Sequence, residues 1–558
     1  MKKLLALLLA TLLTLSMYSI ALSEEGRNFY DYHDYSQYPL GDGSSDAPTI
    51  KLALYADPTY HPNAWDTWFW PWMKQASGLN FDIEQVLTTA ISEKKNLMFA
   101  ADDLPDAIIG FNFTPSELVK YGQIEGQLLP LNKYITPEIM PNLSKWLEDF
   151  PETYALITAP DGNIYSFPKL DVHSPGNEER FFWNKNWLAE VNAEVPQTLD
   201  ECLEILYAMK KAHPDTYPLG GGAKGNDPRS YILNAFGFLT EEGSDEGYGL
   251  ALKEGELVIP GGTALYKEYL TIMHQLYVDE IINPSFFSME KTAIESIVAE
   301  DQCGAYPSYV YTITPEVEKF QQWTSCVPMT SQWSDARQWL RRKTVYIGGC
   351  VLSANYKDAE LFCRWLDFLY SDLGAQYCWD GPAANNDDCM DLTGGYIIDP
   401  ETNSIAFPDV MNGAYENNYG FILAKNYGLG SCIGNMRTAI GHPEWRRDQL
   451  DQIFYGLEPV SIAYDVTNGD GCFRESIRVA LTEFETSDFP YQMYFDEETN
   501  LELSDLSAVI NPYIEAETAK FITGVRDLSE FDKYLDELKS LNFDKYLGIY
   551  LDSYNSTK

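Results

Sequence analysis

The first part of the chain alternates short apolar runs with amphipathic segments. Residues 48–56 alternate and then become apolar between turn residues, a pattern typical of a buried strand. Residues 81–86 and 104–110 predict two further strands, and residues 65–78 and 92–101 predict helices, the first of which stops at a glycine. Because strands alternate with helices, the pattern predicts the α/β class with a parallel sheet.

The same alternation returns further along the chain. Thr198 and Glu201 form the capping box of a helix, and residues 217–222 predict a short strand. Asp227 and Pro228 suit the N-cap and first-turn positions of the next helix.

The remaining segments extend the pattern to the end of the chain. A strand is expected over 344–354, a helix over 358–371 and a helical end from about 512 to 555. Residues 24–47 are acidic and rich in Tyr, without helical or strand periodicity, so they are expected to form a flexible tether.

The N-terminus has the pattern of a signal peptide. Lys2 and Lys3 precede an apolar run over 4–21, and small residues allow cleavage after Ser23, which makes 1–23 the signal peptide. An uncleaved membrane anchor is the alternative, because the run is close to the roughly 17–25 residues that span a bilayer. Either way the protein is expected to be secreted or held at the cell surface, and periplasmic if its source is Gram-negative.

Charge limits the choice of partners. The formal net charge is −44, or −46 without Lys2 and Lys3, which excludes nucleic acid as a partner and favours a neutral ligand. Arg337 and the run 341–343 form a local basic cluster, interpreted as a solvated face. If that cluster instead lines the ligand site, an acidic ligand is favoured.

Motifs for cofactors and metals are weak. Residues 220–225 match the short G-x-G-x-x-G pattern, which is interpreted as a flexible loop because a secreted protein has little use for a dinucleotide. The six histidines are scattered, and the acidic run 465–470 is interpreted as an ordinary turn, so neither a metal nor a cofactor is expected. The nine cysteines contain no C-x-x-C pair, and most are expected to be small buried apolar residues.

Aromatic residues in polar loops are the more informative signal. Sugars present apolar C–H faces edged by hydroxyls, so a sugar site needs aromatic rings surrounded by hydrogen-bonding side chains. Trp187 and Trp365 lie on helix faces and are assigned to the core. The predicted ligand-binding residues, chosen because they lie at strand ends or in adjoining loops, are Tyr55, Asp57, Phe111, Asn112, Asp227, Arg229, Tyr309 and Trp379.

Several stretches, in the expected order, resemble family 1 extracellular solute-binding proteins, and they span most of the mature chain. Two departures accompany the resemblance: residues 212–218 are too short for the calcium loop of long members, and no lipid-anchoring Cys is visible near residue 23. The resembling stretches are 104–109 (LPDAII), 162–168 (GNIYSFP), 183–188 (WNKNWL), 195–201 (VPQTLDE), 365–371 (WLDFLYS) and 519–524 (AKFITG).

The resemblance implies a two-lobed, periplasmic-binding-protein-like (type II) α/β fold with a hinge and an interlobe cleft. Lobe 1 is expected over 48–170 plus about 345–385, and lobe 2 over 175–343 plus about 386–558, with the strand near 345–352 as the hinge crossing.

The implied function is non-catalytic capture of a carbohydrate, expected to be a neutral oligosaccharide, for an ABC importer. Its partners would be the membrane permease subunits and their ATPase, and the protein is expected to be a monomer. A secreted glycoside hydrolase and an oligopeptide-binding receptor are the alternatives.

Overall fold

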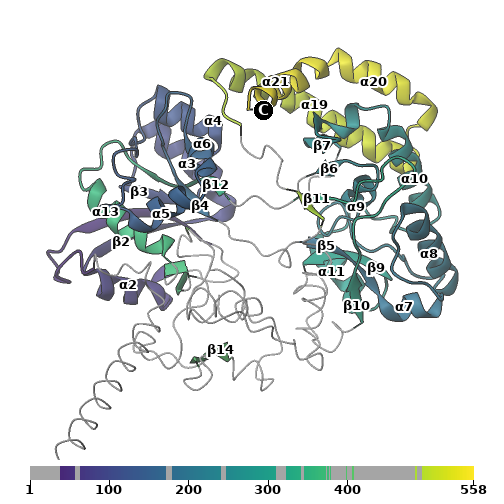
Figure 1. Cartoon of the computed structure of the whole chain (residues 1–558), viewed down its shortest axis with the longest axis horizontal. Helices are drawn as coiled ribbons and strands as arrows, with labels where there is room; N and C mark the ends of the chain where they lie inside the picture. Colours follow the sequence, from purple (N-terminus) through teal and green to yellow (C-terminus); the bar gives the residue numbers. More distant parts are fainter. Residues whose placement is uncertain are drawn as a thin grey trace, which may run out of the picture. The chain divides into compact units, whose positions relative to one another are not determined.

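The chain forms two compact units, each built from two separate stretches of sequence (Figure 1). Unit 1 comprises Met1–Val172 and Thr344–Ile462, and unit 2 comprises His173–Lys343 and Ala463–Lys558. The computed structural model describes residues 38–56, 63–170, 179–240, 247–309, 322–340, 345–371, 374–375, 377–378, 397–398, 405–406, 436, 484–486 and 493–557.

Unit 1 is organised around a five-stranded sheet in the order β2-β1-β3-β12-β4. β1 pairs in parallel with β2 and β3, whereas β12 runs antiparallel to β3 and β4. The first three predicted strands are therefore confirmed and pair in parallel as expected, whereas the 344–354 strand is confirmed but joins the sheet antiparallel. The strands are β1 (Thr49–Ala56), β2 (Asn80–Leu87), β3 (Ala107–Ile109), β4 (Phe167–Leu170) and β12 (Val345–Leu352).

Helices cover this sheet, and α2 ends as predicted at Gly78, which has the left-handed φ of 68° that glycine tolerates. The segment expected to be one helix over 358–371 is α13 followed by a 3₁₀ turn. The helices of unit 1 are α2 (Phe69–Ser77), α3 (Ile91–Ala101), α4 (Pro115–Leu118), α5 (Pro141–Asp149), α6 (Glu152–Ile157) and α13 (Ala359–Asp367), with short turns at Ala64–Asp66, Thr88–Ala90, Val119–Ile124 and Phe368–Tyr370.

The core of unit 1 is rich in tryptophan. Trp70 and Trp365 are fully buried and stacked, with ring centroids 6.2 Å apart, which confirms the core assignment of Trp365. Met436 is also buried in this core, and its carbonyl accepts a hydrogen bond from the Leu170 N–H. The predicted assignment of residue 436 to lobe 2 is therefore wrong, because unit 1 extends beyond residue 385 to Ile462.

The described end of the expected tether is packed rather than flexible. Tyr38 Oη donates to the Trp365 carbonyl at 2.9 Å, and the N–H groups of Leu40 and Gly41 donate to the Ser77 carbonyl. The tether prediction is wrong for 38–47, because the partly buried Tyr38 and backbone pairing hold this segment against α2 and α13.

Unit 2 contains a three-stranded antiparallel sheet in the order β10-β5-β9 and a smaller antiparallel sheet in the order β6-β7-β8. The strand predicted over 217–222 is wrong, since this segment makes only single bridges, such as Leu219 with Ala305. The strands of unit 2 are β5 (Glu179–Asn184), β6 (Leu239–Thr240), β7 (Ala251–Lys253), β8 (Glu256–Val258), β9 (Ala305–Tyr309), β10 (Trp323–Ser325) and the parallel pair β11 (Trp339–Leu340) and β15 (Glu485–Thr486). A further short pair, β13 (Ile397–Ile398) with β14 (Ile405–Ala406), falls in the sequence of unit 1.

The helices of unit 2 confirm the Thr198–Glu201 capping box, and Trp187 is buried as predicted. Two boundaries differ from the predictions: Pro228, rather than Asp227, is the N-cap of α9, and Pro512 lies inside α19 instead of opening it. The helices are α7 (Lys185–Glu190), α8 (Leu199–Ala212), α9 (Arg229–Asn234), α10 (Tyr266–Val278), α11 (Lys291–Ala299), α19 (Glu497–Thr523), α20 (Phe531–Ser540) and α21 (Phe543–Thr557), with 3₁₀ turns at Pro260–Gly262 and Leu528–Glu530.

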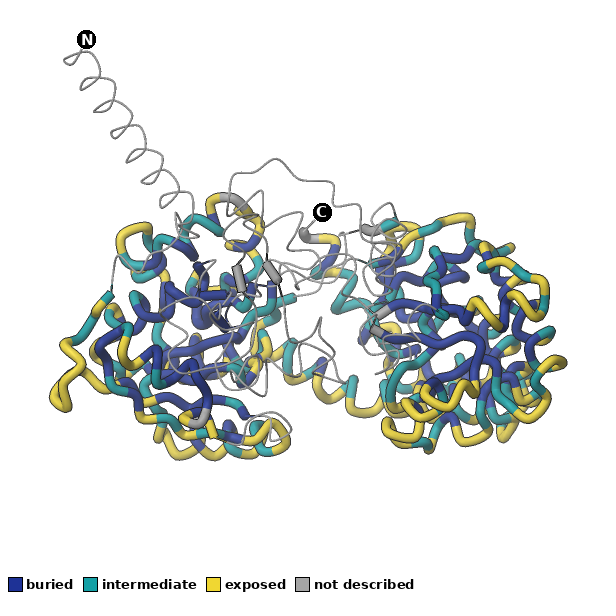
Figure 2. Tube along the Cα trace, turned by 90° about the horizontal axis from the view of Figure 1, so that it is seen from below, coloured by how far each residue is buried: buried dark blue, intermediate teal, exposed yellow. Residues whose placement is uncertain are grey.

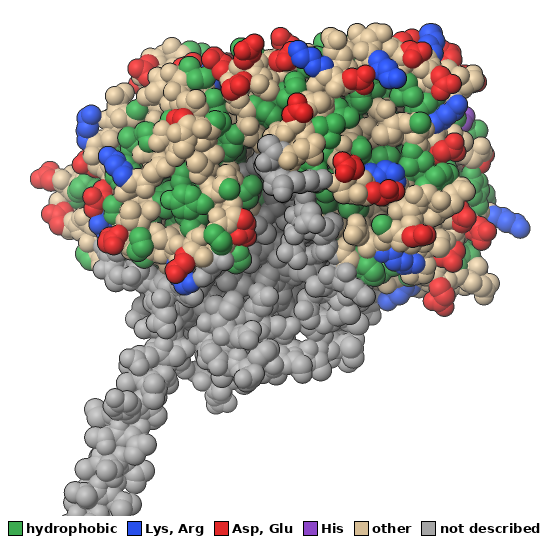
Figure 3. Space-filling model, turned by 45° about the horizontal axis from the view of Figure 1, so that its top comes forward, with side chains coloured by type: hydrophobic (Ala, Val, Ile, Leu, Met, Phe, Trp, Pro, Cys, Tyr) green, Lys and Arg blue, Asp and Glu red, His purple; other side chains and the backbone are tan. Residues whose placement is uncertain are grey.

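Each unit has its own buried interior, drawn dark blue in Figure 2, and exposed loops and helix faces surround it. Six cysteines in the described part of the chain are buried and unbridged, as expected for small apolar residues, and burial raises the pKa of the Cys326 thiol to about 12. The visible surface intersperses Asp and Glu with Lys and Arg (Figure 3). Of the helices in the described ranges, none has both the length and the apolar character needed to cross a membrane.

Candidate ligand-binding site

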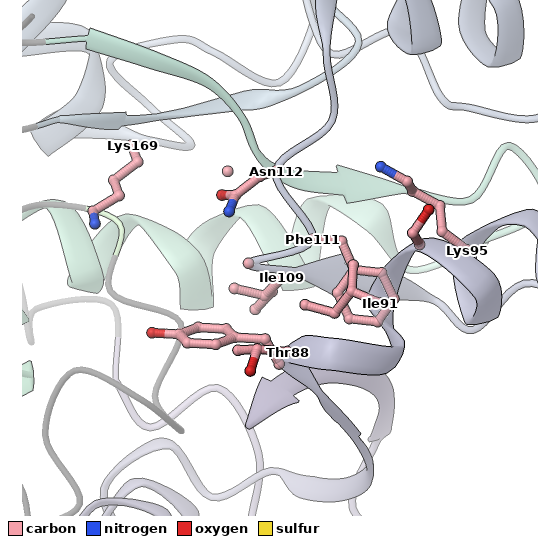
Figure 4. A pocket seen from close by; sticks show the side chains of 11 residues that line it. Thr88, Ile91, Lys95, Ile109, Phe111, Asn112 and Lys169 are labelled. Carbon is pink, nitrogen blue, oxygen red and sulfur yellow. The ribbon is translucent and has the colours of Figure 1, made fainter. Parts of the chain in front are cut away.

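A pocket of about 480 Å³ lies in unit 1 where the carboxyl ends of three parallel strands meet (Figure 4). Tyr55 lies near the end of β1, Thr88 directly follows β2, and Ile109 ends β3. This edge of an open α/β sheet is where such folds bind ligands. The lining residues are Tyr55, Thr88, Ile91, Ser92, Lys95, Ile109, Gly110, Phe111, Asn112, Lys169 and Gly349.

Gly110 lets the Tyr55 ring lie against the backbone at the floor of the pocket. Its φ is +77°, and a Cβ placed there would approach Tyr55 Cδ1 to 2.0 Å. Both the backbone angle and the close approach therefore require glycine. The half-buried Tyr55 ring is held in place while part of it remains open to the pocket.

The loop after β3 is tied to β12 by backbone hydrogen bonds. The Gly110 N–H donates to the Gly349 carbonyl at 2.8 Å, and the Phe113 N–H donates to the Gly348 carbonyl at 3.3 Å. Between these ties, Asn112 is exposed and has a left-handed φ of 49°. Figure 4 shows the amide of Asn112 and the ammonium of Lys169 on the same side of the pocket.

Lys95 on α3 forms the opposite wall of the pocket. Its Nζ lies 2.7 Å from Glu117 Oε1 and donates to Glu117 Oε2 at 2.8 Å, and it sits 4.8 Å from the centroid of the Phe113 ring. The Lys95 side chain is only 8% exposed, whereas that of its counter-ion Glu117 is 23% exposed, so a buried cation meets a partly exposed carboxylate.

The structure brings together three of the predicted ligand residues, Tyr55, Phe111 and Asn112. Asp57 and Trp379 lie outside the described residues. Tyr309 ends β9 in unit 2, and its side chain also lies outside what the structure describes.

Asp227 and Arg229 form an ion pair in unit 2. The Arg229 Nε donates to Asp227 Oδ1 and Oδ2 at 3.0 and 2.9 Å, and its guanidinium lies 5.4 Å from the Phe286 ring and 5.6 Å from the Phe287 ring. The Arg229 side chain is 3% exposed and that of Asp227 is 10% exposed, so both charges of the pair are largely buried. Contact of either residue with a ligand stays a prediction.

The glycines of 220–225 form a turn before α9. Gly222 and Gly225 pair with each other. Gly221 has a φ of +117°, and a Cβ placed on it would lie only 2.1 Å from the Asn226 carbonyl oxygen. Because the described segment before these glycines forms no strand, the strand–turn–helix context of a dinucleotide site is not built there.

Sequence reasoning missed several lining residues. Thr88 follows a predicted strand and Ser92 opens a predicted helix, so their positions at the sheet edge carried a usable signal. Lys169 and Gly349 come from strands that pair across 180 residues of sequence, and no local pattern indicates that they meet.

The described residues contain no group of three or more His, Cys, Asp or Glu side chains suited to a metal ion. The acidic run 465–470 lies outside the described residues, as do 341–343. Arg337, the described member of the basic cluster, donates to Gln197 Oε1 at 2.8 Å.

Comparisons with known proteins agree with this architecture. No family model matches the chain. The chain is 25% identical over 494 residues to the fructooligosaccharide ABC transporter substrate-binding protein FusA of Streptococcus pneumoniae, covering 84% of this chain and 83% of that protein. The FusA structure in complex with kestose matches with a TM-score of 0.69 at 21% identity, covering 91% of this chain and 100% of that one.

A further structure, the extracellular solute-binding protein from Bifidobacterium longum subsp. infantis, matches with a TM-score of 0.71 at 15% identity, covering 92% of this chain and 99% of that one. The fold and these similarities define the class of fold: the chain has the two-lobed, mixed α/β fold of extracellular solute-binding proteins, and it is similar in sequence to an ABC transporter substrate-binding protein. The predicted resemblance and fold class are confirmed. The relatives named above are substrate-binding or solute-binding proteins.

Proposed function

We propose that this protein captures an oligosaccharide outside the cell and delivers it to an ABC importer. The observation that carries the proposal is the unit 1 pocket, where Tyr55 and Asn112 meet at the carboxyl ends of three parallel strands. The similarity to FusA, named for fructooligosaccharides, supports the same ligand class.

The chemistry of the pocket suits a sugar. The Tyr55 ring offers a flat apolar surface for the C–H face of a pyranose or furanose ring. Asn112 can both donate and accept hydrogen bonds, and Thr88 and Ser92 add hydroxyl groups around the ring. The Lys169 ammonium can donate a hydrogen bond to a sugar hydroxyl.

We propose a neutral ligand, because the net charge of −44 opposes the approach of an anionic polymer. The proposed partners are membrane permease subunits with a cytoplasmic ATPase. The protein is proposed to act as a monomer, either secreted or attached at the cell surface.

A side-by-side thermal-shift screen tests the function. Kestose and other neutral oligosaccharides should raise the midpoint of thermal unfolding in proportion to the logarithm of their concentration above Kd, whereas oligopeptides should leave it unchanged. Stabilisation by peptides alone would indicate an oligopeptide receptor. Hydrolysis of the sugar by pure protein, abolished by changing one carboxylate, would indicate a glycoside hydrolase.

A further inference from the structure

The loop that carries Phe111 and Asn112 is held from two sides. On one side, the backbone of β12 accepts hydrogen bonds from Gly110 and Phe113. On the other side, Glu117 closes a capping box on Thr114, whose N–H donates to Glu117 Oε2 at 2.8 Å.

Lys95 joins this second side to α3. Its ammonium contacts both carboxylate oxygens of Glu117 and lies over the Phe113 ring. Phe113 is itself buried, with its ring packed edge-on against Phe99 at 5.7 Å. One buried cation therefore connects the carboxylate and the aromatic ring that flank Asn112 on its C-terminal side.

We propose that Lys95 is a positioning residue for the ligand site: it acts through Glu117 and Phe113 to hold the 110–114 loop with Asn112 turned into the pocket. The inference rests on the proposed function for its ligand, but the ordering of the loop does not depend on that ligand. This contact suits the role, because Lys95 is buried and Glu117 is only partly exposed, so changing either residue leaves the other without its counter-ion beside the loop.

The alternative role for a lysine in a pocket wall is direct contact with the sugar, and the two roles predict different mutant patterns. A positioning role requires the pair, so Lys95→Met and Glu117→Gln should weaken binding alike, and the double variant should be little worse than either single one. Glu117→Gln keeps an oxygen that can accept from Thr114, so the cap survives while the charge is lost. Direct contact instead predicts a large loss for Lys95→Met and little loss for Glu117→Gln.

Calorimetry with kestose measures the first readout. We expect Lys95→Met to weaken binding about 3- to 30-fold, the range found when coupled residues are changed, and Lys95→Arg to restore most of it. Lys94→Met is the matched control: Lys94 is the neighbouring residue on α3, pairs with Glu84 at the surface and does not line the pocket, so binding should stay unchanged.

Amide hydrogen exchange of the ligand-free protein gives the second readout. In Lys95→Met, the Phe113 and Thr114 amides should exchange faster, while the β1 amides stay protected and report an intact sheet. If the wild type binds no oligosaccharide but the loop amides still loosen, the proposed function fails and the positioning role stands. Unchanged loop exchange, or a large binding loss confined to Lys95 variants, overturns the inference.

Discussion

At the residue scale, the pocket depends on how one aromatic ring is held. Tyr55 packs where Gly110 has no side chain, and the left-handed φ of Gly110 turns the chain into the loop that carries Asn112. A single glycine thus sets both the ring that a sugar can stack on and the amide that can bind its hydroxyls.

Removing the Tyr55 ring should cost affinity more than stability. We expect Tyr55→Ala to weaken oligosaccharide binding by about 1–3 kcal/mol, by analogy with aromatic stacking on other flat ligands. Calorimetry against kestose checks this, with Tyr154→Ala, an exposed tyrosine of unit 1 outside the pocket, as the control. Normal binding by Tyr55→Ala would remove the ring from the site.

Adding one methyl group at Gly110 should displace the Tyr55 ring, which packs against this glycine. Gly110→Ala forces an L-residue into a positive φ and drives its Cβ into Tyr55, so we expect both affinity and stability to fall, the latter by more than about 1 kcal/mol. Gly126→Ala is a comparison with a similar φ of +64° but open space around the Cβ, and it should cost only the backbone strain. Equal effects of the two changes on binding would argue against the Tyr55 contact.

At the element scale, helices are fixed by side chains that lie far away in sequence. The Asp367 carboxylate, at the end of α13, accepts hydrogen bonds from the N–H groups of Asn142 and Leu143 at 3.1 and 3.0 Å. It also accepts from Asn142 Nδ2 at 2.8 Å. One buried carboxylate therefore caps the N-terminus of α5 in place of a local N-cap side chain, which Met140 cannot supply.

Asp367→Asn should destabilise unit 1. The amide removes the negative charge and turns an N–H toward donors, so we expect a loss of about 1–3 kcal/mol in the free energy of unfolding. Urea unfolding measures this loss. Asp358→Asn, on an exposed residue of the same helix that makes no side-chain cap hydrogen bond, should change stability little.

A charge cluster fastens α19 to α20 in unit 2. Arg526 reaches Glu517 at 2.5 Å and Glu537 at 2.9 Å, and Lys520 lies 2.6 Å from Glu517. Burial alone would raise the pKa of Glu517, but the hydrogen bonds and charges of Lys520 and Arg526 outweigh it and hold that pKa below its ordinary 4.5.

This cluster should make stability depend on pH in a defined direction. Because the folded pKa of Glu517 is lowered, its contribution is complete above pH 4.5 and is lost as the pH falls through the folded value. Glu517→Gln should therefore cost about 1–3 kcal/mol near pH 7 and progressively less in acid, as measured by urea unfolding across pH. Glu515→Gln, exposed on the same helix, should show no such trend, and a pH-independent cost for Glu517→Gln would contradict the assignment.

At the scale of the whole molecule, the acidic field should select among sugars. Asp and Glu total 83 against 39 Lys and Arg, and charges are screened beyond about 10 Å at 0.1 M salt. The field therefore acts strongly on an approaching polyanion at low salt and leaves a neutral sugar unaffected.

Titrating a neutral and an acidic oligosaccharide at low and high salt tests this selection. The affinity for the neutral sugar should not change with salt, and the acidic sugar should bind weakly, more so at low salt. Tight binding of the acidic sugar that weakens steeply as salt rises would show that local lysines such as Lys169 overcome the field.

The sequence by itself determined the elements whose causes are local. The strand at 49–56, the helix that stops at Gly78 and the capping box of Thr198 and Glu201 follow from side-chain periodicity, a left-handed glycine and reciprocal capping bonds. It also grouped Tyr55, Phe111 and Asn112, which line one pocket because residues just past parallel strands meet at one sheet edge; their contact with a ligand stays a prediction.

Only the tertiary structure decided what depends on pairing between distant segments. It inserted β12 antiparallel between β3 and β4, brought Lys169 and Gly349 into the pocket, and packed Tyr38 against the Trp365 carbonyl in a segment without periodicity. It also gave the buried Lys95 its partner Glu117, 22 residues away. These contacts form because buried polar groups must be hydrogen-bonded and the core must be closely packed. Both conditions depend on surfaces that exist only in the folded chain, so no local pattern encodes the contacts.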